Sequence, residues 1–366
     1  MSRLATRVSP TVINGCVRSL YALPRSLRRK IAGPPVYRDG QRLCLDAQLL
    51  LRVADRATAP LSAGDPAQAR ADLARSVAIL TRRPTDRVGT RDLNIPNGTH
   101  DISARLYTPD TLPAGSPLLV FYHGGGFVLG NIATHEAVCR YLAARAQVRV
   151  LSVDYRLAPE HPFPAAVEDA MAAFDYAVRN AEALGADPTA VAVGGDSAGG
   201  NLAASVSIGA APGAKPRFAL LFYPGTDLST RYPSKDLFAE GFLLTDADIT
   251  WFADQYVHPD ARRDPRVSVL LAEDLTDFPA TYLATAGFDP LRDEGEAFAD
   301  RLAQAGVPVA LRRHADLIHG FASFVELGGR FREALAEAAG ALRTGLAMHR
   351  ASAAEPDGAN TQPKSV

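Results

Sequence analysis

The feature that most constrains the fold is an alternation of short apolar runs with helix-prone stretches. The apolar runs are residues 118–123, 148–154, 190–193, 218–223, 280–286 and 307–312, and helical patterns follow at 134–146, 164–184, 198–210, 293–305 and 329–347. Continuous apolar strands separated by helices are typical of a mostly parallel sheet that helices cover on both faces. Two more strands, 91–95 and 102–107, flank Asn97-Gly98, a strong hairpin signal. We therefore predict an α/β fold with eight strands.

One junction in this pattern carries a reactive group. The segment Gly195-Asp196-Ser197-Ala198-Gly199 lies between an apolar run and a helix-prone stretch, and it matches G-x-S-x-G. So sharp a strand-to-helix turn strains the backbone of the serine and places its hydroxyl at the apex. Only residues without bulk fit beside such a turn, and the Ala198 N–H begins a helix, where developing negative charge is favoured. The plainer alternative is a glycine-rich helix entry that merely contains a serine.

A second segment also follows an apolar run directly. It consists of His123, three glycines (Gly124, Gly125 and Gly126) and Phe127. Consecutive glycines leave backbone N–H groups uncovered, so a substrate oxygen can approach them. With the N–H after the serine they can form an oxyanion hole, in which one donor is worth about 10²–10³ in kcat. A phosphate-binding loop is the alternative reading, but neither of its usual glycine patterns is present.

Two further segments place an acid and a base after strands. Asp289 follows the run at 280–286, and His319 follows the last strand. In open α/β sheets ligands bind at the carboxyl ends of the strands, so these side chains should meet Ser197 there. A serine hydroxyl needs a nearby base, and the base needs an acid that holds its tautomer. We therefore predict Ser197 as nucleophile, His319 as base and Asp289 as acid.

Other titratable residues near these positions are weaker candidates. His314 competes with His319, but it lies earlier in the segment beside two arginines. Asp293 and Glu294 are better suited to open the next helix, where carboxylates offset the positive helix end. Asp196 adjoins the serine, and inside the turn its side chain should point away from the base.

Two regions interrupt or precede the alternation. Residues 41–57 and 66–80 predict helices, the second with Asp65 as N-cap, a proline in first position and Gln68 as capping-box partner. No strand is expected before them. The insertion at 226–275 carries several aromatic residues and could join these helices as a lid. We expect Phe127, Phe238, Phe242 and Trp251 to line a substrate pocket; the alternative is that the insertion's aromatics form only its core.

The N-terminal residues 1–38 hold eight Arg or Lys and no Asp or Glu. No continuous apolar stretch follows, so we reject a signal peptide. One expectation is a partly disordered basic arm over residues 1–40. The other is an amphipathic arm on an anionic membrane, which would use Val12, Ile13, Val17, Leu20 and Tyr21. Residues 350–366 are small and polar, so we expect a disordered tail.

Composition bears on which partners the protein can bind and on the cellular compartment in which it works. A net charge of −1 argues against nucleic acid, which needs a strongly basic face. Three scattered cysteines, Cys16, Cys44 and Cys139, suit reduced thiols and a cytoplasmic location, with membrane association as the other expectation.

Taken in order, these motifs resemble the hormone-sensitive-lipase-like branch of α/β-hydrolase esterases, also called the bacterial family IV lipases and esterases. The similar stretches are 123–127, 154–165, 195–200, 289–295 and 319–321, and the resemblance extends over about residues 85–345. It implies a carboxylic-ester hydrolase with a cap formed by residues 41–85 and 226–275 on a catalytic domain at 86–349. It also implies the triad Ser197, Asp289 and His319, with Gly124, Gly125 and Ala198 as oxyanion donors, and it leaves open which two of the three glycines donate.

The resemblance implies no metal and no cofactor. We expect short- to medium-chain acyl esters as substrates, and the partner would be the small ester itself, with a homodimer as a further expectation. Amide or carbamate hydrolysis by the same triad is the nearer alternative. A small-molecule receptor without catalysis is the more distant one, because such members have typically lost the histidine that stands here at position 319.

Overall fold

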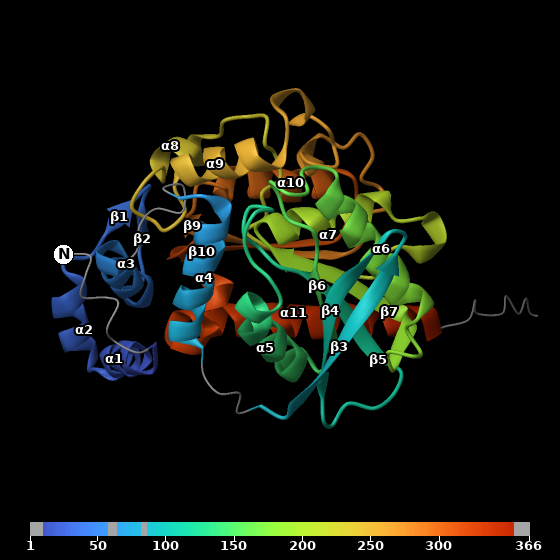
Figure 1. The fold of residues 1–366 in the computed structure, drawn as a ribbon, viewed down its shortest axis with the longest axis horizontal. Coiled ribbons are helices and arrows are strands. Elements are labelled where there is room, and N and C mark those ends of the chain that lie inside the picture. Colours follow the sequence, from blue (N-terminus) through green and yellow to red (C-terminus); the bar gives the residue numbers. More distant parts are fainter. Residues whose placement is uncertain (1–9, 58–63, 82–85, 355–366) are drawn as a thin grey trace, which may run out of the picture.

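The computed structural model describes residues 10–57, 64–81 and 86–354, and its centre is an eight-stranded sheet (Figure 1). The strands are β3 (Val88–Asn97), β4 (His100–Pro109), β5 (Ser116–Tyr122), β6 (Arg149–Asp154), β7 (Ala186–Asp196), β8 (Ala219–Phe222), β9 (Thr281–Phe288) and β10 (Val309–Ile318). They lie in the order β10, β9, β8, β7, β5, β6, β4, β3. Only β3 with β4 and β4 with β6 pair antiparallel. The predicted mostly parallel sheet and its opening hairpin are confirmed.

Helices cover both faces of the sheet, as predicted. One face carries α6 (Ala165–Arg179), α7 (Ala198–Gly209) and α10 (Arg292–Gln304), and the other carries α5 (Glu136–Ala146) and α11 (Gly329–Ala354). Because successive side chains of a strand point to opposite faces, a continuous apolar run fills both layers.

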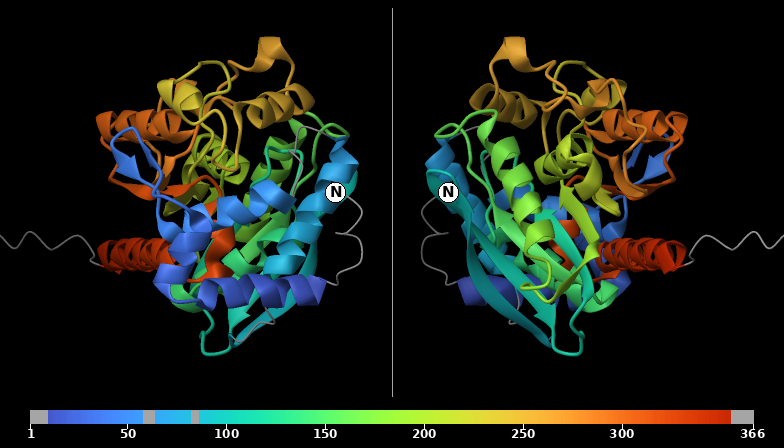
Figure 2. Two further views of the ribbon diagram at one scale, coloured as in Figure 1. Left: turned by 90° about the vertical axis from the view of Figure 1, so that its left-hand side faces the viewer. Right: turned by 90° about the vertical axis from the view of Figure 1, so that its right-hand side faces the viewer.

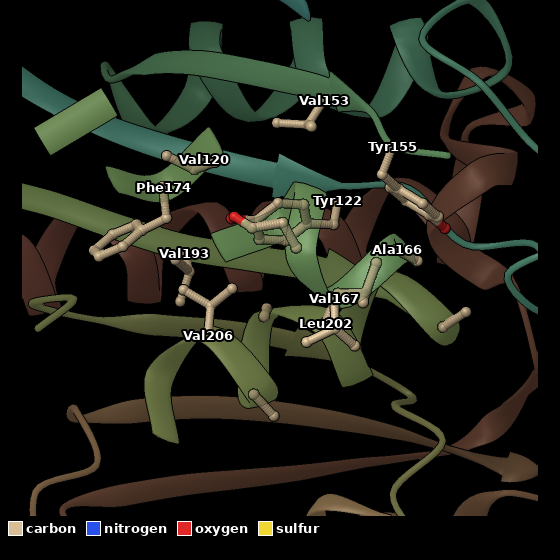
Figure 3. Close-up of a cluster of buried hydrophobic side chains, with 14 of the residues drawn as sticks. Val120, Tyr122, Val153, Tyr155, Ala166, Val167, Phe174, Val193, Leu202 and Val206 are labelled. Carbon is tan, nitrogen blue, oxygen red and sulfur yellow. The ribbon is translucent and has the colours of Figure 1, made fainter. Parts of the chain in front are cut away.

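Figure 3 shows part of the layer beneath α6 and α7. The Tyr122 ring lies there among apolar side chains of both helices, including Phe174 and Leu202. Its hydroxyl donates to the carbonyl of Ala170 at 2.8 Å. This layer anchors the end of β5, where the glycine segment begins.

The N-terminal residues differ from expectation. From Pro10 onward they form α1 (Pro10–Ala22) and α2 (Arg25–Ala32), so a partly disordered arm is wrong for residues 10–40. A short hairpin follows, β1 (Tyr37–Arg38) with β2 (Gln41–Arg42), and α3 (Leu45–Ala57) begins only after it. The predicted helix therefore starts four residues too early, and strands do precede it. Residues 1–9 lie outside the described part of the chain.

These first elements pack on segments far along the chain. The Asp46 carboxylate in α3 accepts from Arg28 of α2 at 2.6 Å and from the backbone N–H of Arg330, in α11, at 3.0 Å. The N–H of Cys44 donates to the carbonyl of Asp316 at 2.9 Å. The N-terminal helices are thus held by residues near the C-terminal end of the described chain.

Helix α4 (Pro66–Leu80) has the predicted start, with the Asp65 side chain accepting from the N–H of Gln68 at 2.8 Å. The capping box is not completed, because the Gln68 side chain donates to Asp72 instead. Helix α1 packs on α4. At the other end of the chain α11 runs to Ala354, so the predicted disordered tail is wrong for 350–354, and 355–366 lie outside the described residues.

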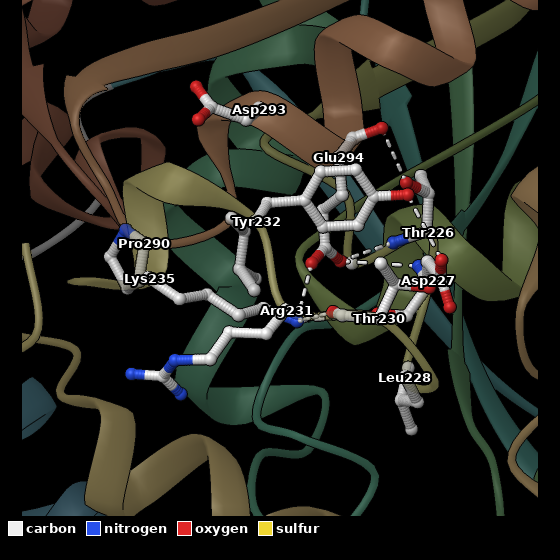
Figure 4. A network of polar contacts seen from close by, with 12 residues as sticks. Thr226, Asp227, Leu228, Thr230, Arg231, Tyr232, Lys235, Pro290, Asp293 and Glu294 are labelled. Carbon is white, nitrogen blue, oxygen red and sulfur yellow. Dashed lines mark hydrogen bonds and ion pairs between the residues drawn. The ribbon is translucent and has the colours of Figure 1, made fainter. Parts of the chain in front are cut away.

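The insertion between β8 and β9 holds α8 (Pro233–Leu237) and α9 (Asp246–Tyr256). Figure 2 shows it (gold) at one end of the molecule. Figure 4 shows how its start is tied to the helix after β9. Lys235 lies 2.9 Å from Glu294, whose carboxylate also accepts from the N–H of Thr226 at 2.8 Å. Both ionic side chains are buried, so the pair fixes the insertion to α10.

Short 3₁₀ helices complete the fold. They are η3 (Ala133–His135), η4 (Pro212–Ala214), η5 (Pro259–Ala261), η6 (Val269–Leu271) and η7 (Phe321–Leu327). No helix in residues 10–57, 64–81 or 86–354 is long and apolar enough to cross a bilayer.

Candidate active site

Ser197 occupies the turn between β7 and α7, with φ +54° and ψ −118°. A non-glycine residue at positive φ is strained, as predicted for the apex of this turn. A side chain on Gly199 would collide with the carbonyl of Tyr122, and one on Gly195 would collide with Gly199 and the same carbonyl. The end of β5 therefore packs directly against the turn, and this packing explains both glycines.

The structure brings the three predicted catalytic side chains together. The Nε2 of His319 lies 3.0 Å from the Oγ of Ser197, and its Nδ1 lies 2.8 Å from Oδ2 of Asp289. The other Asp289 oxygen accepts from the N–H of Leu291 at 2.8 Å. Because a carboxylate only accepts, Nδ1 carries the imidazole proton and Nε2 is free to accept from the serine hydroxyl. Asp289 is fully buried, so water does not compete for this chain of bonds.

The weaker candidates lie elsewhere. The Nδ1 of His314 accepts from Arg330 at 3.0 Å, away from the serine. Asp293 accepts from the N–H of Ser234 at 2.8 Å, and Glu294 pairs with Lys235. Neither carboxylate reaches His319, so the geometry favours the acid and the base that the sequence indicated.

The glycine segment corrects one prediction. The N–H of Gly124 donates to Oδ1 of Asp196 at 2.9 Å and is therefore not available to a substrate oxygen. The N–H groups of Gly125, Gly126 and Ala198 have no acceptor within the described part of the chain. Gly125 and Gly126 have φ of +122° and +60°, which glycine adopts without strain. Two glycines and the helix start thus leave free donors near the serine.

Asp196 has a role that sequence reasoning missed. It points away from His319, as expected, and its Oδ1 also lies 3.3 Å from Nε2 of His135. Burial alone would raise the pKa of Asp196, but the His135 imidazole and the Gly124 N–H outweigh burial and lower its pKa. The carboxylate thus ties the glycine segment to the serine turn. The one sequence signal was an ionisable residue inside a turn built of small residues.

A second buried imidazole lies beneath the glycine segment. His123 stacks on the Tyr155 ring at 4.3 Å, and the Tyr155 hydroxyl donates to the His123 carbonyl. Burial, and then the neighbouring His135, lower the pKa of His123 to about 3, so the ring is neutral at ordinary pH. The neutral His123 ring, packed on Tyr155, therefore helps to hold the glycine segment in place.

The predicted pocket residues separate into two groups. Phe238 and Phe242 pack with Phe288 in the hydrophobic core and are 0% and 5% exposed, which favours the alternative that these two belong to the core; their pocket role stays a prediction. Phe127 stacks on Tyr256 of α9, and Trp251 is partly exposed beside Phe252. For Phe127 and Trp251 a pocket role stays a prediction.

Two separate segments contact the glycine segment or the residue that follows it. A side chain on Gly126 would collide with the ring of Phe252, so α9 rests directly on it. Arg70 of α4 donates to the carbonyl of Val128 at 2.8 Å and pairs with Glu160. The sequence offered no signal for either contact. Across the described ranges, no three His, Cys, Asp or Glu side chains gather where they could hold a metal ion.

The sheet, the serine turn and the hydrogen-bonded Asp–His–Ser chain define an α/β hydrolase. A family model described as an alpha/beta hydrolase fold matches residues 119–323. Carboxylic ester hydrolase LipN of Mycobacterium tuberculosis is 44% identical over 351 residues, 93% of each chain. Ethyl acetate hydrolase of Pseudomonas putida is 38% identical over 283 residues, covering 75% of this chain and 88% of its own.

Solved structures agree with these sequence relatives. The ester hydrolase EH1AB1 from the metagenome of Lake Arreo, solved with a bipyridine phosphonate derivative, superposes with a TM-score of 0.79 at 39% identity. The match covers 82% of this chain and 98% of that one. The chain belongs to the hormone-sensitive-lipase-like family of α/β-hydrolase esterases, and it is an enzyme of the carboxylesterase type.

Proposed function

We propose that this enzyme hydrolyses carboxylic esters through an acyl-enzyme on Ser197. The Oγ of Ser197 bonds to the carbonyl carbon while its proton passes to Nε2 of His319. The tetrahedral intermediate collapses as the bond to the alcohol oxygen breaks, and Nε2 returns the proton to that oxygen. Water then attacks the acyl-enzyme by the same route and releases the acid. Asp289 holds the imidazole tautomer and stabilises the imidazolium.

The observation that supports this proposal most strongly is the unbroken chain from Asp289 through His319 to Ser197, at 2.8 and 3.0 Å. We assign the oxyanion donors to the N–H groups of Gly125, Gly126 and Ala198. Their support is that the remaining glycine N–H is taken by Asp196. Three preorganised donors can each contribute about 10²–10³ in kcat.

Replacement of the nucleophile tests the mechanism. Ser197→Ala should abolish ester hydrolysis and labelling by a fluorophosphonate probe, while thermal unfolding should remain close to that of the wild type. A variant that kept most of its esterase activity would overturn the assignment. A wild-type enzyme that is not labelled would favour a receptor instead, and faster turnover of matched amides or carbamates would favour the nearer alternative.

For the substrate we propose short- to medium-chain acyl esters. The support is the close contact of Phe252 with Gly126, which places a bulky ring directly against the glycine segment, and the name of the ethyl acetate hydrolase relative. Rates on p-nitrophenyl esters of increasing acyl length should peak at short chains. A maximum at long chains would contradict the proposal.

We also propose that the protein contacts anionic membranes, through α2 and not through the residues first expected. Helix α1 packs on α4, and the hydroxyl of Tyr21 donates to the carbonyl of Asp46, so this side faces the protein. Leu27 and Ile31, one turn apart on α2, are 43% and 40% exposed. Residues 10–38 contain basic side chains and no acidic one. Exposed aliphatic side chains among cations suit an anionic lipid surface.

The test is co-sedimentation of the full chain with vesicles of phosphatidylglycerol or phosphatidylcholine. Leu27→Asp/Ile31→Asp should lower binding to the anionic vesicles, whereas Leu311→Asp, at an equally exposed leucine of β10, should not. Equal partitioning of all three proteins would refute the contact. The homodimer stays a prediction.

A further inference from the structure

Leu243, in the insertion, is an unusual residue for its position. It is one of six large hydrophobic residues that are exposed in the described part of the chain, at 39%. Its φ is +79°, a left-handed conformation that costs a non-glycine residue free energy. Neither exposure nor positive φ favours a leucine, because glycine or asparagine would serve a surface turn better.

The neighbouring residues fix this conformation. The N–H of Leu244 donates to the carbonyl of Phe242 at 3.2 Å, so Leu243 is the central residue of a γ-turn of the rare, strained kind. Phe242 is buried against Phe288, and Leu244 is buried in the other large apolar cluster, which also includes Phe252 and Tyr256 of α9. Both neighbours are thus anchored in separate apolar clusters, while Leu243 between them stays exposed.

The Leu243 side chain lies against the segment that carries His319. The Cδ2 of Leu243 is 3.7 Å from the point where a Cβ on Gly320 would lie, and Gly320 directly follows His319. The glycine segment, with Phe252 against it, presents the free N–H donors that the carbonyl oxygen of an ester would meet. Leu243 is therefore an apolar surface that contacts the segment carrying the imidazole.

We propose that Leu243 contacts the alcohol part of the ester and sets the preference of the enzyme among alcohols. The inference rests on the proposed hydrolysis by Ser197. Nε2 of His319 must reach the alcohol oxygen in order to protonate it, so the alcohol substituent leaves the reacting carbon on the imidazole side. Residues beside Gly320 meet that substituent, whereas the acyl chain extends in another direction from the same carbon.

Two substrate series separate the two halves of the ester. In the first the acyl group is acetyl throughout and the alcohol lengthens from methyl to butyl to hexyl. In the second the alcohol is p-nitrophenol throughout and the acyl chain lengthens. Leu243→Ala should lower the ratio of kcat/KM for hexyl over methyl acetate by about tenfold, the size expected for lost apolar contact with a few methylenes. The acyl series should keep its wild-type profile.

A second variant, Leu243→Gly, removes the same side chain without adding strain to the turn. It should shift the alcohol ratio in the same direction and raise the unfolding midpoint, because glycine relieves the strain at φ +79°. Leu311→Ala, at another exposed leucine, is the matched control and should leave both series unchanged.

These experiments separate the role of Leu243 from the proposed ester hydrolysis by Ser197. An unchanged alcohol ratio, or an equal change in the acyl series, would overturn the role of Leu243 while Ser197→Ala still abolished activity. Activity that survived Ser197→Ala would instead overturn the mechanism itself.

Discussion

Two buried Asp–His pairs lie near Ser197, and they are connected differently. Asp289 and His319 lie 2.8 Å apart, and Asp196 and His135 lie 3.3 Å apart. Both carboxylates are buried at strand ends. The second nitrogen of His319 faces the Ser197 hydroxyl, whereas that of His135 faces the hydroxyl of Thr134 at 2.9 Å. The two pairs therefore differ in what the second ring nitrogen faces: the proposed nucleophile Ser197 for His319, and the hydroxyl of the adjacent Thr134 for His135.

The two pairs should differ most in kcat when the charge of each carboxylate is removed by an Asp→Asn substitution. Asp289→Asn should lower kcat by about 10⁴-fold, as in other serine triads, because the amide favours the wrong imidazole tautomer. Steady-state kinetics on a short-chain aryl ester measure this loss. Nearly full activity would mean that another carboxylate, Asp293 first, supports His319.

Asp196→Ala should have a smaller effect, lowering kcat by about 10²-fold with little change in KM. The Gly124 N–H loses its acceptor, and the donors on Gly125 and Gly126 lose their fixed position. Asp196→Asn keeps an acceptor oxygen and should recover most of the rate. The matched control is Asp169→Asn, a buried carboxylate bound to Arg156, which should change stability more than kcat. Equal losses in the alanine and asparagine variants would argue against the tether.

His135→Gln should act mainly on stability. Removing a partner from buried Asp196 leaves a carboxylate oxygen less satisfied, which costs about 1–3 kcal/mol. We expect that loss in denaturant unfolding together with a decrease in kcat of less than tenfold. A decrease as large as that of Asp289→Asn would show that this pair takes part in the chemistry.

The smallest effect on activity is expected at an imidazole outside both pairs, His314, which has a cationic partner and should act on stability alone. Burial first, and then Arg330, lower the pKa of His314 to about 3. The unfolded chain takes up a proton at about 6.5 and the folded chain does not, so stability falls as the pH drops from about 6.5 toward 3. The slope is at most about 1.4 kcal/mol per pH unit for this one site. His314→Gln should flatten that slope in unfolding measured from pH 7 to pH 4, and an unchanged slope would contradict the shift.

Sequence patterns could predict the sheet and the convergence of Ser197, Asp289 and His319 because each strand is marked by a local apolar run. Each run also has a direction, so the residue after it can be placed. An apolar run predicts a buried strand, and the residue after it lies at the carboxyl end of the sheet. Ser197, Asp289 and His319 each follow such a run, so they converge once the strands are parallel. No pattern predicts how loops pack on one another. The contact of Phe252 with Gly126, the exposure of Leu243 and the burial of Phe238 depend on tertiary packing alone.

Gly124 shows what a sequence motif alone does not predict: which backbone N–H groups are free. Three adjacent glycines look equivalent in the sequence, and only the position of the Asp196 side chain reveals that one N–H is already bonded. In the N-terminal arm the sequence suggested too little order, because a run of basic residues without acidic ones is typical of disorder. Contacts of Arg28 and Tyr21 with Asp46, supplied by a later helix, make that segment ordered.

The contacts of Cys44 and Asp46, at the start of α3, with Asp316 and Arg330 have a consequence for biosynthesis. A ribosome releases the first helices long before residues 316–330, on which they dock, have been made. During that interval their apolar sides have no permanent neighbour, which is the condition under which nascent chains aggregate or recruit chaperones. Arrested chains that end before residue 316 should therefore remain protease-sensitive at their amino-terminal end, whereas full-length chains become resistant there.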